Sequence, residues 1–144
     1  MIYKRIVNVE DPDISYLTSV LGQPDIARFI SIDEVNYWTY VTETENVFYF
    51  KAFENDALVA ATHCEIINDT LYMDVMVIPD YQRNGIATKI LNDIQSGNLP
   101  LDYDKIEISI DKSNTASIRL FEKMNFKLVS VEDELLNYEW VKSD

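Results

Sequence analysis

A strand, a short turn and the start of a helix follow one another between Met73 and Thr88. The apolar run M-D-V-M-V-I ends at Pro79, a polar turn follows, and Gly85 precedes an amphipathic segment. The first backbone N–H groups of a helix have no partner inside it, and the helix dipole places partial positive charge there. A glycine lets a ligand approach the backbone closely. This stretch therefore predicts a phosphate-binding turn, although an ordinary strand-to-helix connection has the same outline.

The chain of 144 residues, with 47% apolar and 26% charged residues, is typical of one globular domain, which we expect to span residues 1–144. No apolar run is long enough for a bilayer helix and the N-terminus lacks the apolar core of a signal peptide, so we expect a cytoplasmic protein without a membrane partner. The net charge of −13 argues against nucleic acid as a partner. The single cysteine, Cys64, permits no internal disulfide and no cysteine-based metal cluster, and its apolar surroundings predict a core position.

Hydrophobic periodicity predicts an α/β (α+β) fold. Strands are expected over residues 2–9, 47–53, 58–67, 71–78, 105–110, 126–131 and 135–141, and helices over 14–21, 33–44, 85–95 and 115–124. Residues 25–32 have no clear pattern. The order β-α-α-β-β-β-α-β-α-β-β predicts a mixed, mostly antiparallel sheet of about seven strands flanked by four helices. The helix between the strands 71–78 and 105–110 requires a crossover, which sets these two strands parallel.

Two segments resemble the signatures of a known family. Gln82-Arg83-Asn84-Gly85-Ile86-Ala87 is similar to the pyrophosphate motif R/Q-x-x-G-x-G/A of the GNAT superfamily of N-acetyltransferases. The segment 114–126, N-T-A-S-I-R-L-F-E-K-M-N-F, resembles the second signature of the superfamily, N-x-x-A-x-x-L-Y-E-K-x-G-F. Both motifs stand in the expected order, and the predicted order of elements across nearly the whole chain also resembles a GNAT-like fold.

The resemblance implies an enzyme that transfers an acetyl group from acetyl-CoA directly to an amine, without a metal. It places the pantetheine arm along the backbone of a strand, as a peptide adds to a strand edge, and the pyrophosphate on the amides of the turn. The residues that it assigns to acetyl-CoA are Met76, Val77, Ile78, Gln82, Arg83, Asn84, Gly85, Ile86, Ala87, Thr88, Asn114, Ser117, Phe121 and Lys123. It implies that the acceptor lies near the first two helices, where Phe29, Tyr37 and Trp38 are candidate contacts and core packing is their alternative role.

The reaction also needs a base. An amine with a pKa near 10.4 is protonated at pH 7, so its lone pair must be freed by removal of a proton. Asp74 and Glu65 are the candidate bases, because they lie on strands expected to flank the cleft; a solvated strand position is the alternative for each. His63 is a further candidate base, and a place within the sheet is its alternative.

Two positions depart from the second signature. Phe121 stands where many members have a tyrosine that protonates the departing thiolate, and phenylalanine has no proton to give. Tyr81, Tyr103 or Tyr138 could supply the proton, or solvent could suffice, because a thiol with a pKa of about 8.5 leaves readily near neutrality. The alternative function is an acyl-CoA-binding or regulatory module without turnover. Asn125 replaces the usual glycine at a left-handed position after a helix, which asparagine tolerates.

The charge distribution bears on the acceptor. Basic and acidic residues nearly balance over residues 82–127, so the negative charge is concentrated in the rest of the chain. This favours an anionic co-substrate at that segment and a cationic acceptor elsewhere, such as a polyamine, an aminoglycoside-like amine or a basic peptide terminus. Solubility is the alternative reason for the acidity. A small-molecule amine or a peptide amine is therefore the expected acceptor, and a homodimer is a further expectation from the superfamily.

Overall fold

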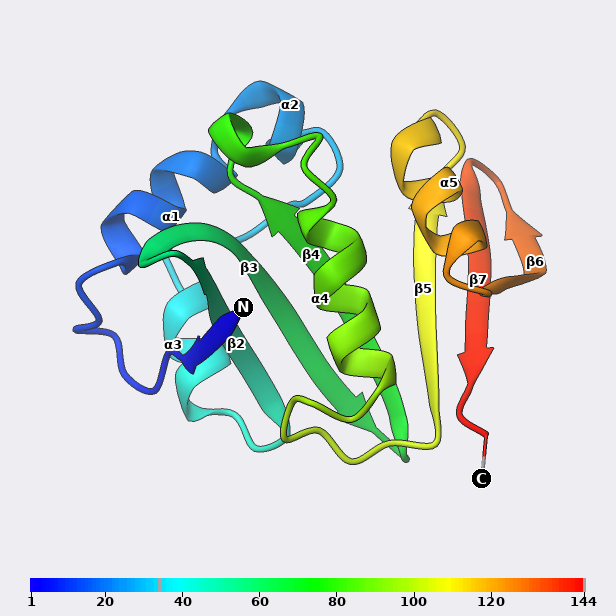
Figure 1. Ribbon diagram of the computed structural model, residues 1–144, viewed down its shortest axis with the longest axis horizontal. Coiled ribbons are helices and arrows are strands. Elements are labelled where there is room, and N and C mark those ends of the chain that lie inside the picture. Colours follow the sequence, from blue (N-terminus) through cyan, green and yellow to red (C-terminus); the bar gives the residue numbers. More distant parts are fainter. Residues whose placement is uncertain (34, 144) are drawn as a thin grey trace.

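The computed structural model of the protein describes residues 1–33 and 35–143, which form one seven-stranded sheet in the order β1-β2-β3-β4-β5-β7-β6 (Figure 1). The strands are β1 (Ile2–Arg5), β2 (Val47–Glu54), β3 (Ala57–Ile67), β4 (Thr70–Val77), β5 (Lys105–Asp111), β6 (Lys127–Glu132) and β7 (Leu135–Val141). The helices are α1 (Ile14–Leu21), α2 (Pro24–Ala27), α3 (Tyr37–Glu43), α4 (Ile86–Gln95) and α5 (Thr115–Lys123), and η1 (Pro79–Tyr81) is a 3₁₀ turn.

The predicted mixed sheet is confirmed, because β4 and β5 pair in parallel and the other neighbouring strands are antiparallel. The described part of the chain has five helices rather than four. The additional helix, α2, lies where the sequence had no clear pattern, since four residues are too few to display a helical period. Pro24 in its first turn and Asp25 beside it are nevertheless favourable at a helix start. No helix among the described residues is long and apolar enough to span a membrane.

Two predicted elements are shorter than expected. The first strand ends at Arg5, because the chain then turns toward the buried ammonium of Lys51, which forms ion pairs of 2.9 and 2.8 Å with Asp11 and Asp13. The second predicted helix begins at residue 37 rather than at residue 33. The carboxylate of Asp33 accepts the backbone N–H of residue 35 and the side-chain amide of residue 36, which holds a turn before the helix. Glu34, which belonged to the predicted helix, lies outside the described residues.

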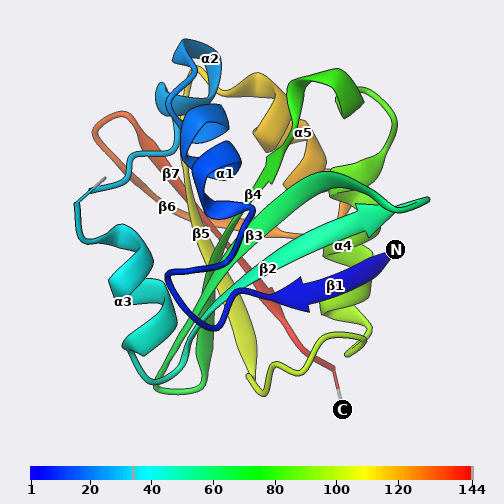
Figure 2. The same ribbon diagram turned by 90° about the vertical axis from the view of Figure 1, so that its left-hand side faces the viewer.

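Helices cover both faces of the sheet (Figure 2). α1, α2 and α3 contribute Leu17, Ile26 and Val41 to an apolar cluster on one face. α4 and α5 contribute to a second cluster on the opposite face. Side chains alternate along a strand, so the side chain of Met76 belongs to the first cluster while that of Val75 packs against the second. β4 thus presents functional groups to both layers.

β4 and β5 separate after a short parallel contact. They pair only between Thr70–Tyr72 and Lys105–Glu107, although β4 continues to Val77 and β5 continues to Asp111. β3 stays paired with β4, and β7 stays paired with β5, over these remaining lengths. Within the described residues, the edge of β4 that faces β5 therefore has no strand partner beyond residue 72. We call this opening the wedge; the two strands that bound it are seen side by side in Figure 1.

Candidate functional site

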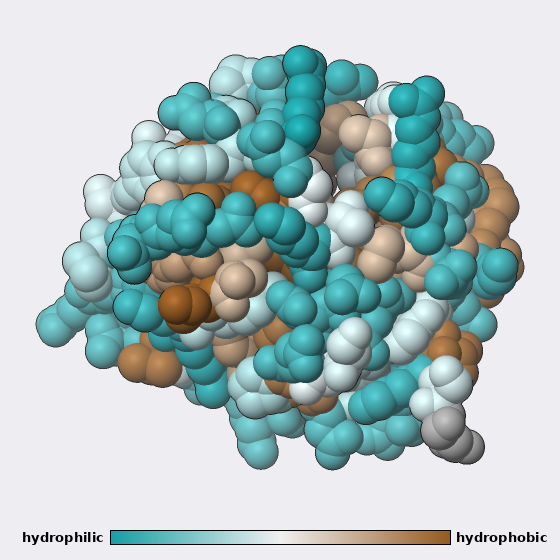
Figure 3. All heavy atoms as spheres, viewed as in Figure 1, coloured by the Kyte–Doolittle hydropathy of each residue, from teal (hydrophilic) through white to brown (hydrophobic). Residues whose placement is uncertain are grey.

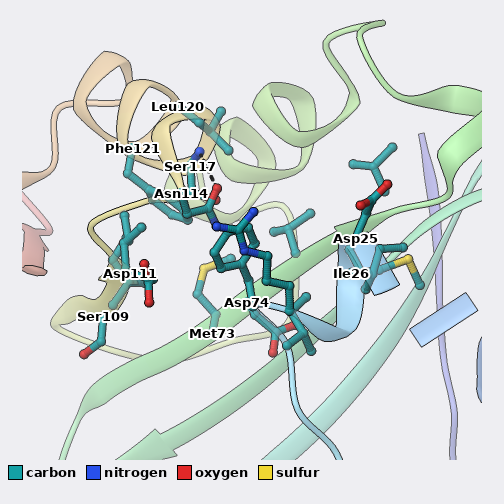
Figure 4. Close-up of a pocket in the computed structure, with 18 of the residues that line it drawn as sticks. Asp25, Ile26, Met73, Asp74, Ser109, Asp111, Asn114, Ser117, Leu120 and Phe121 are labelled. Carbon is teal, nitrogen blue, oxygen red and sulfur yellow. Dashed lines mark hydrogen bonds between the residues drawn. The ribbon is translucent and has the colours of Figure 1, made fainter. Parts of the chain in front are cut away.

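The wedge contains a cleft of about 380 Å³. β4, β5, α2 and α5 contribute its walls, with residues from β4 below and residues from α5 above (Figure 4). Figure 3 shows apolar atoms within a hollow at the upper edge of the molecule, bordered by polar side chains. Several residues predicted from the sequence line the cleft: Phe29, Asp74, Met76, Val77, Gln82, Asn114, Ser117 and Phe121.

The turn before α4 leaves backbone N–H groups at the helix start without acceptors among the described residues. Gly85 has a φ of 73°, in the left-handed region that glycine adopts without strain. The side-chain amide of Gln82 donates to the carbonyl of Val77 at 3.2 Å, which ties the turn to the end of β4. No acceptor within residues 1–33 and 35–143 receives the backbone N–H of Ile86 or of the two residues that follow it. These amides can therefore bind a phosphate.

Both ends of α5 are capped. The Asn114 side chain accepts the backbone N–H of Ser117 at 3.3 Å, as an N-cap residue does. Asn125 has a φ of 71°, and the N–H of Phe126 bonds to the carbonyl of Phe121 at 3.0 Å, which confirms the predicted left-handed end. Phe121 packs edge to face on Phe126, with ring centres 5.0 Å apart. The caps thus hold Phe121 in the wall of the cleft.

Asp74 is the acidic residue of β4 that reaches the cleft. It stands opposite His63 in the pairing of β3 with β4. Burial raises the pKa of its carboxyl, while the charge and backbone N–H of His63 act in the opposite direction. Asp74 and Phe121 lie on different sides of the cleft (Figure 4). A carboxyl with a raised pKa in a cleft is typical of a group that exchanges protons with a ligand.

Glu65 is placed differently. It stands opposite Tyr72, two residue pairs along the register from His63 and Asp74, and is absent from the cleft walls formed by the described residues. The Tyr40 hydroxyl donates to its carboxylate, and His63 Nε2 lies 3.6 Å from the Glu65 Oε1 atom. Asp74 therefore lies at the cleft, whereas Glu65 is hydrogen-bonded to Tyr40 of α3.

The three aromatic residues predicted to contact the acceptor lie in different environments. Phe29 lines the cleft and is 36% exposed. Tyr37 lies on α3, where its hydroxyl is 2.7 Å from His63 Nδ1. Trp38 is buried, and its indole N–H donates to the Thr18 hydroxyl at 2.9 Å. Trp38 thus has the packing role that was the alternative at the sequence level, while Phe29 is in direct reach of a ligand.

For other residues that the resemblance assigns to acetyl-CoA, the structure limits which of their groups a ligand can reach. The side chains of Met76, Ile78 and Ile86 are buried, so only their backbone groups could bind a ligand, and the backbone N–H of Ile78 already donates to the carbonyl of Val59 at 2.9 Å. Arg83 and Lys123 are exposed outside the cleft walls, where a side chain can reach only an extended ligand.

The tyrosines considered as proton donors lie elsewhere. Tyr103 donates to the carbonyl of Ile94 at 2.7 Å, and burial raises its pKa to about 12. Tyr138 donates to Glu122 at 2.9 Å. Tyr81 packs against both apolar clusters. None of the three belongs to the cleft walls that the described residues form.

Arg28 and Asp111 are site residues that the sequence did not suggest. The guanidinium of Arg28 donates to the Ser113 hydroxyl at 3.3 Å, and the Ser113 hydroxyl donates to Asp111 at 2.6 Å. This chain of bonds joins Arg28, which directly follows α2, to Asp111 at the end of β5. Its hydrogen bonds from Ser113, together with the charge of Arg28, lower the pKa of Asp111. Asp25 also lines the cleft, so three carboxyl groups and one guanidinium border it.

Comparison with known proteins agrees with this arrangement. Residues 16–126 match the family model described as the acetyltransferase (GNAT) family. A search of curated proteins found no match.

Solved structures share the fold. N-acetyltransferase PseH from Campylobacter jejuni in complex with acetyl coenzyme A is 12% identical with a TM-score of 0.76, covering 99% of this chain and 100% of that chain. The aminoglycoside N(6')-acetyltransferase from Legionella pneumophila is 13% identical with a TM-score of 0.78, covering 97% and 91%. The ribosomal-protein-S18-alanine N-acetyltransferase from Escherichia coli is 16% identical with a TM-score of 0.68, covering 99% and 96%. At these identities the likeness establishes the fold.

Proposed function

This chain belongs to the acetyltransferase (GNAT) family, and from that premise we propose that it transfers an acetyl group from acetyl-CoA directly to an amine. One observation carries the proposal. A free strand edge and a carboxyl with a raised pKa lie at a single cleft, and Gln82 in its wall belongs to the turn that leads to the helix amides without acceptors.

The cleft suits acetyl-CoA in three respects. The free edge of β4 offers backbone groups such as those of Val77 to the amides of the pantetheine arm, as in strand addition. The amides at the start of α4 suit the pyrophosphate. The apolar side chains of Met73, Leu120 and Phe121 suit the thioester end of the arm. We therefore keep the sequence-based assignment of the co-substrate to these elements.

Asp74 is the proposed base. Freeing an amine of pKa near 10.4 at pH 7 requires about 4.6 kcal/mol, and a nearby carboxylate lowers that barrier by accepting the proton. Acetyl-CoA supplies an acetyl thioester, whose carbonyl carbon bonds to the amine nitrogen as the bond to sulfur breaks. The proton stays on the Asp74 carboxyl until solvent removes it. The departing sulfur takes a proton from solvent.

The acceptor is proposed to be cationic. Asp25, Asp74 and Asp111 border the cleft, and their charge favours an ammonium group over a neutral or anionic one. The Legionella and Escherichia coli proteins are named for an aminoglycoside and for a protein alanine, which fits either a small-molecule or a peptide amine. Release of free thiol from acetyl-CoA across a panel of such amines tests the proposal. Binding of CoA without thiol release for any amine would instead support the acyl-CoA-binding module.

Phe121→Tyr tests whether a missing hydroxyl limits the reaction. We expect kcat at pH 7 to change by less than about tenfold, because a thiolate of pKa about 8.5 leaves without a protein acid. Thiol release under saturating acetyl-CoA and amine measures this. An increase of about a hundredfold or more would contradict the assignment of this proton to solvent.

The expected homodimer is proposed to form through β6. This strand pairs only with β7 among the described strands, and its side chains Leu128, Val129 and Val131 are 50%, 52% and 52% exposed. Its sequence, K-L-V-S-V-E, begins with a positive and ends with a negative residue, so two antiparallel copies match in charge. Antiparallel pairing with β6 of a second copy puts Lys127 opposite Glu132 of that copy, and the reverse, while the apolar residues cover one another.

Charge reversal tests that interface. Lys127→Glu should weaken dimerisation by about fivefold or more, because it creates two like-charge pairs at about 0.5–1 kcal/mol each. Glu132→Lys should do the same, and the double variant should restore the dimer. Sedimentation across a concentration series measures each constant. A monomer at every concentration, or no recovery in the double variant, would contradict the pairing.

A cytoplasmic location and a single domain over residues 1–144 stay predictions. Both apolar clusters pack on one sheet, which supports one cooperative unit. The cytoplasm would supply acetyl-CoA.

A further inference from the structure

His63 lies in a pocket of aromatic rings directly beside Asp74. The rings of Tyr37, Tyr40 and Tyr49 have centres 5.6, 6.5 and 6.4 Å from the imidazole centre. The His63 side chain keeps 18% of its exposure, so the imidazole is largely shielded from water. His63 is thus enclosed by aromatic rings, although it does not line the cleft itself.

Both imidazole nitrogens have partners that suit a charged ring. Nε2 lies 3.6 Å from the carboxylate of Glu65, which attracts an N–H and stabilises a positive charge. Nδ1 lies 2.7 Å from the Tyr37 hydroxyl, which can donate to a neutral ring and can accept from a charged one. Burial raises the pKa of Tyr37 far above its ordinary value, so its hydroxyl keeps its proton. His63 can therefore carry a charge without leaving a nitrogen unpaired.

The register of the sheet places His63 beside Asp74, so a charge on the imidazole acts on the Asp74 carboxyl. His63 and Asp74 are directly opposite on β3 and β4, and opposite residues of an antiparallel pair have Cβ atoms about 4.5–5.5 Å apart on the same face. An opposite charge at about 4–6 Å favours an ionised carboxylate. Removal of the imidazole would leave only the backbone N–H of residue 63 to oppose the effect of burial on the Asp74 carboxyl.

We propose that His63 is a positioning residue, which keeps Asp74 ionised at the cleft wall so that the carboxylate can accept the proton of the amine. The role in catalysis rests on the proposed acetyl transfer; the electrostatic effect on Asp74 does not. Other titratable or charged groups lie on the elements packed around this pair. They are Tyr37 and Tyr40 of α3, Tyr49 of β2, Glu65 of β3, Tyr72 of β4, Asp25 of α2, Arg28 directly after α2, and Asp111 of β5. His63 differs from the others in standing opposite Asp74 in the strand pairing, and its charge lowers the pKa of the Asp74 carboxyl.

The test is a carbon NMR titration of the side-chain carboxyls in the full chain, without acetyl-CoA or amine. Asp74→Asn identifies the Asp74 signal. In His63→Gln, the midpoint of the Asp74 titration should move to higher pH by at least about one unit. The acid limb of the kcat/KM profile should move in the same direction by the same amount. An unchanged Asp74 midpoint in His63→Gln would overturn the proposal.

Tyr37→Phe provides a second test that retains the imidazole. It removes the oxygen that accepts from charged His63, so the Asp74 midpoint should move in the same direction by a smaller amount. Tyr138→Phe, which also deletes one buried phenol hydroxyl but on β7, is the matched control and should leave the Asp74 midpoint in place. A wild-type protein that acetylates no amine, yet shows these shifts, would refute the proposed function while supporting the effect of His63.

Discussion

Asp74→Asn should lower kcat/KM for a cationic amine by about 10²- to 10⁴-fold at pH 7, the usual range for loss of a general base. The amide has the shape of the carboxylate but cannot accept the proton. The backbone of β4 and the helix amides that would hold acetyl-CoA are unaffected, so the dissociation constant for CoA should stay the same. Thiol release and calorimetric titration with CoA measure the two quantities separately.

The pH dependence and stability of the same variant follow from the raised pKa of Asp74. The rising limb of the wild-type kcat/KM profile should have its midpoint above the ordinary aspartate value, and Asp74→Asn should remove that limb. In the wild type, the ionised carboxylate is less favourable in the folded than in the unfolded chain. The ionised carboxylate therefore lowers the free energy of unfolding. This loss of stability is complete at pH values above the pKa of Asp74 in the folded chain, and it disappears at pH values below its pKa in the unfolded chain. Asp74→Asn should therefore raise Tm at pH 7.

Two further variants, in which a glutamate is replaced by glutamine, serve as comparisons for Asp74→Asn. Glu107→Gln changes a carboxylate on β5, outside the cleft walls of the described residues, and should leave kcat/KM unchanged. Glu65→Gln separates the two candidate bases. If Glu65→Gln removes the rising limb and Asp74→Asn retains it, the assignment of the base to Asp74 is wrong.

Ala87→Asp should weaken binding of CoA on the order of 100-fold or more. Ala87 is the second residue of α4, where the unpaired amides are proposed to hold the pyrophosphate. A carboxylate about 4 Å from a phosphate charge costs up to about 4 kcal/mol at an effective dielectric constant of 20. The same carboxylate stabilises the helix by about 0.3–1 kcal/mol through the dipole. Binding and Tm should therefore change in opposite directions.

Ala116→Asp is the matched control for this charge. Ala116 is the second residue of α5 and is exposed, outside the residues that line the cleft. The variant should show the same small gain in Tm and retain CoA affinity within a fewfold change. Equal loss of affinity in both variants would mean that general repulsion, rather than a site at α4, explains the effect.

The local structure of the turn before α4 and of both ends of α5 could be predicted from the sequence because its signals are local. The glycine turn at Gly85, the N-cap Asn114 and the left-handed Asn125 each depend on a few neighbouring residues, and the structure places each where its local pattern indicated. The parallel pairing of β4 and β5 followed from the crossover alone.

The other contacts around the cleft could not be predicted in the same way, because they join distant segments. Arg28 meets Ser113, 85 residues along the chain, and nothing in either local sequence indicates the contact. Tyr37 and Trp38 are adjacent aromatic residues on α3, yet one bonds to His63 and the other to Thr18. Asp74 and Glu65 looked equivalent until the register placed one at the cleft and the other beside α3.

The short parallel ladder between β4 and β5 joins two halves of the sheet through only three residue pairs. A strand-like ligand in the wedge would occupy the place of a missing strand and bridge both halves. At a concentration of 100 times its dissociation constant, such a ligand raises the free energy of unfolding by about 2.7 kcal/mol. The fraction of the protein that resists proteolysis would then follow the supply of acetyl-CoA.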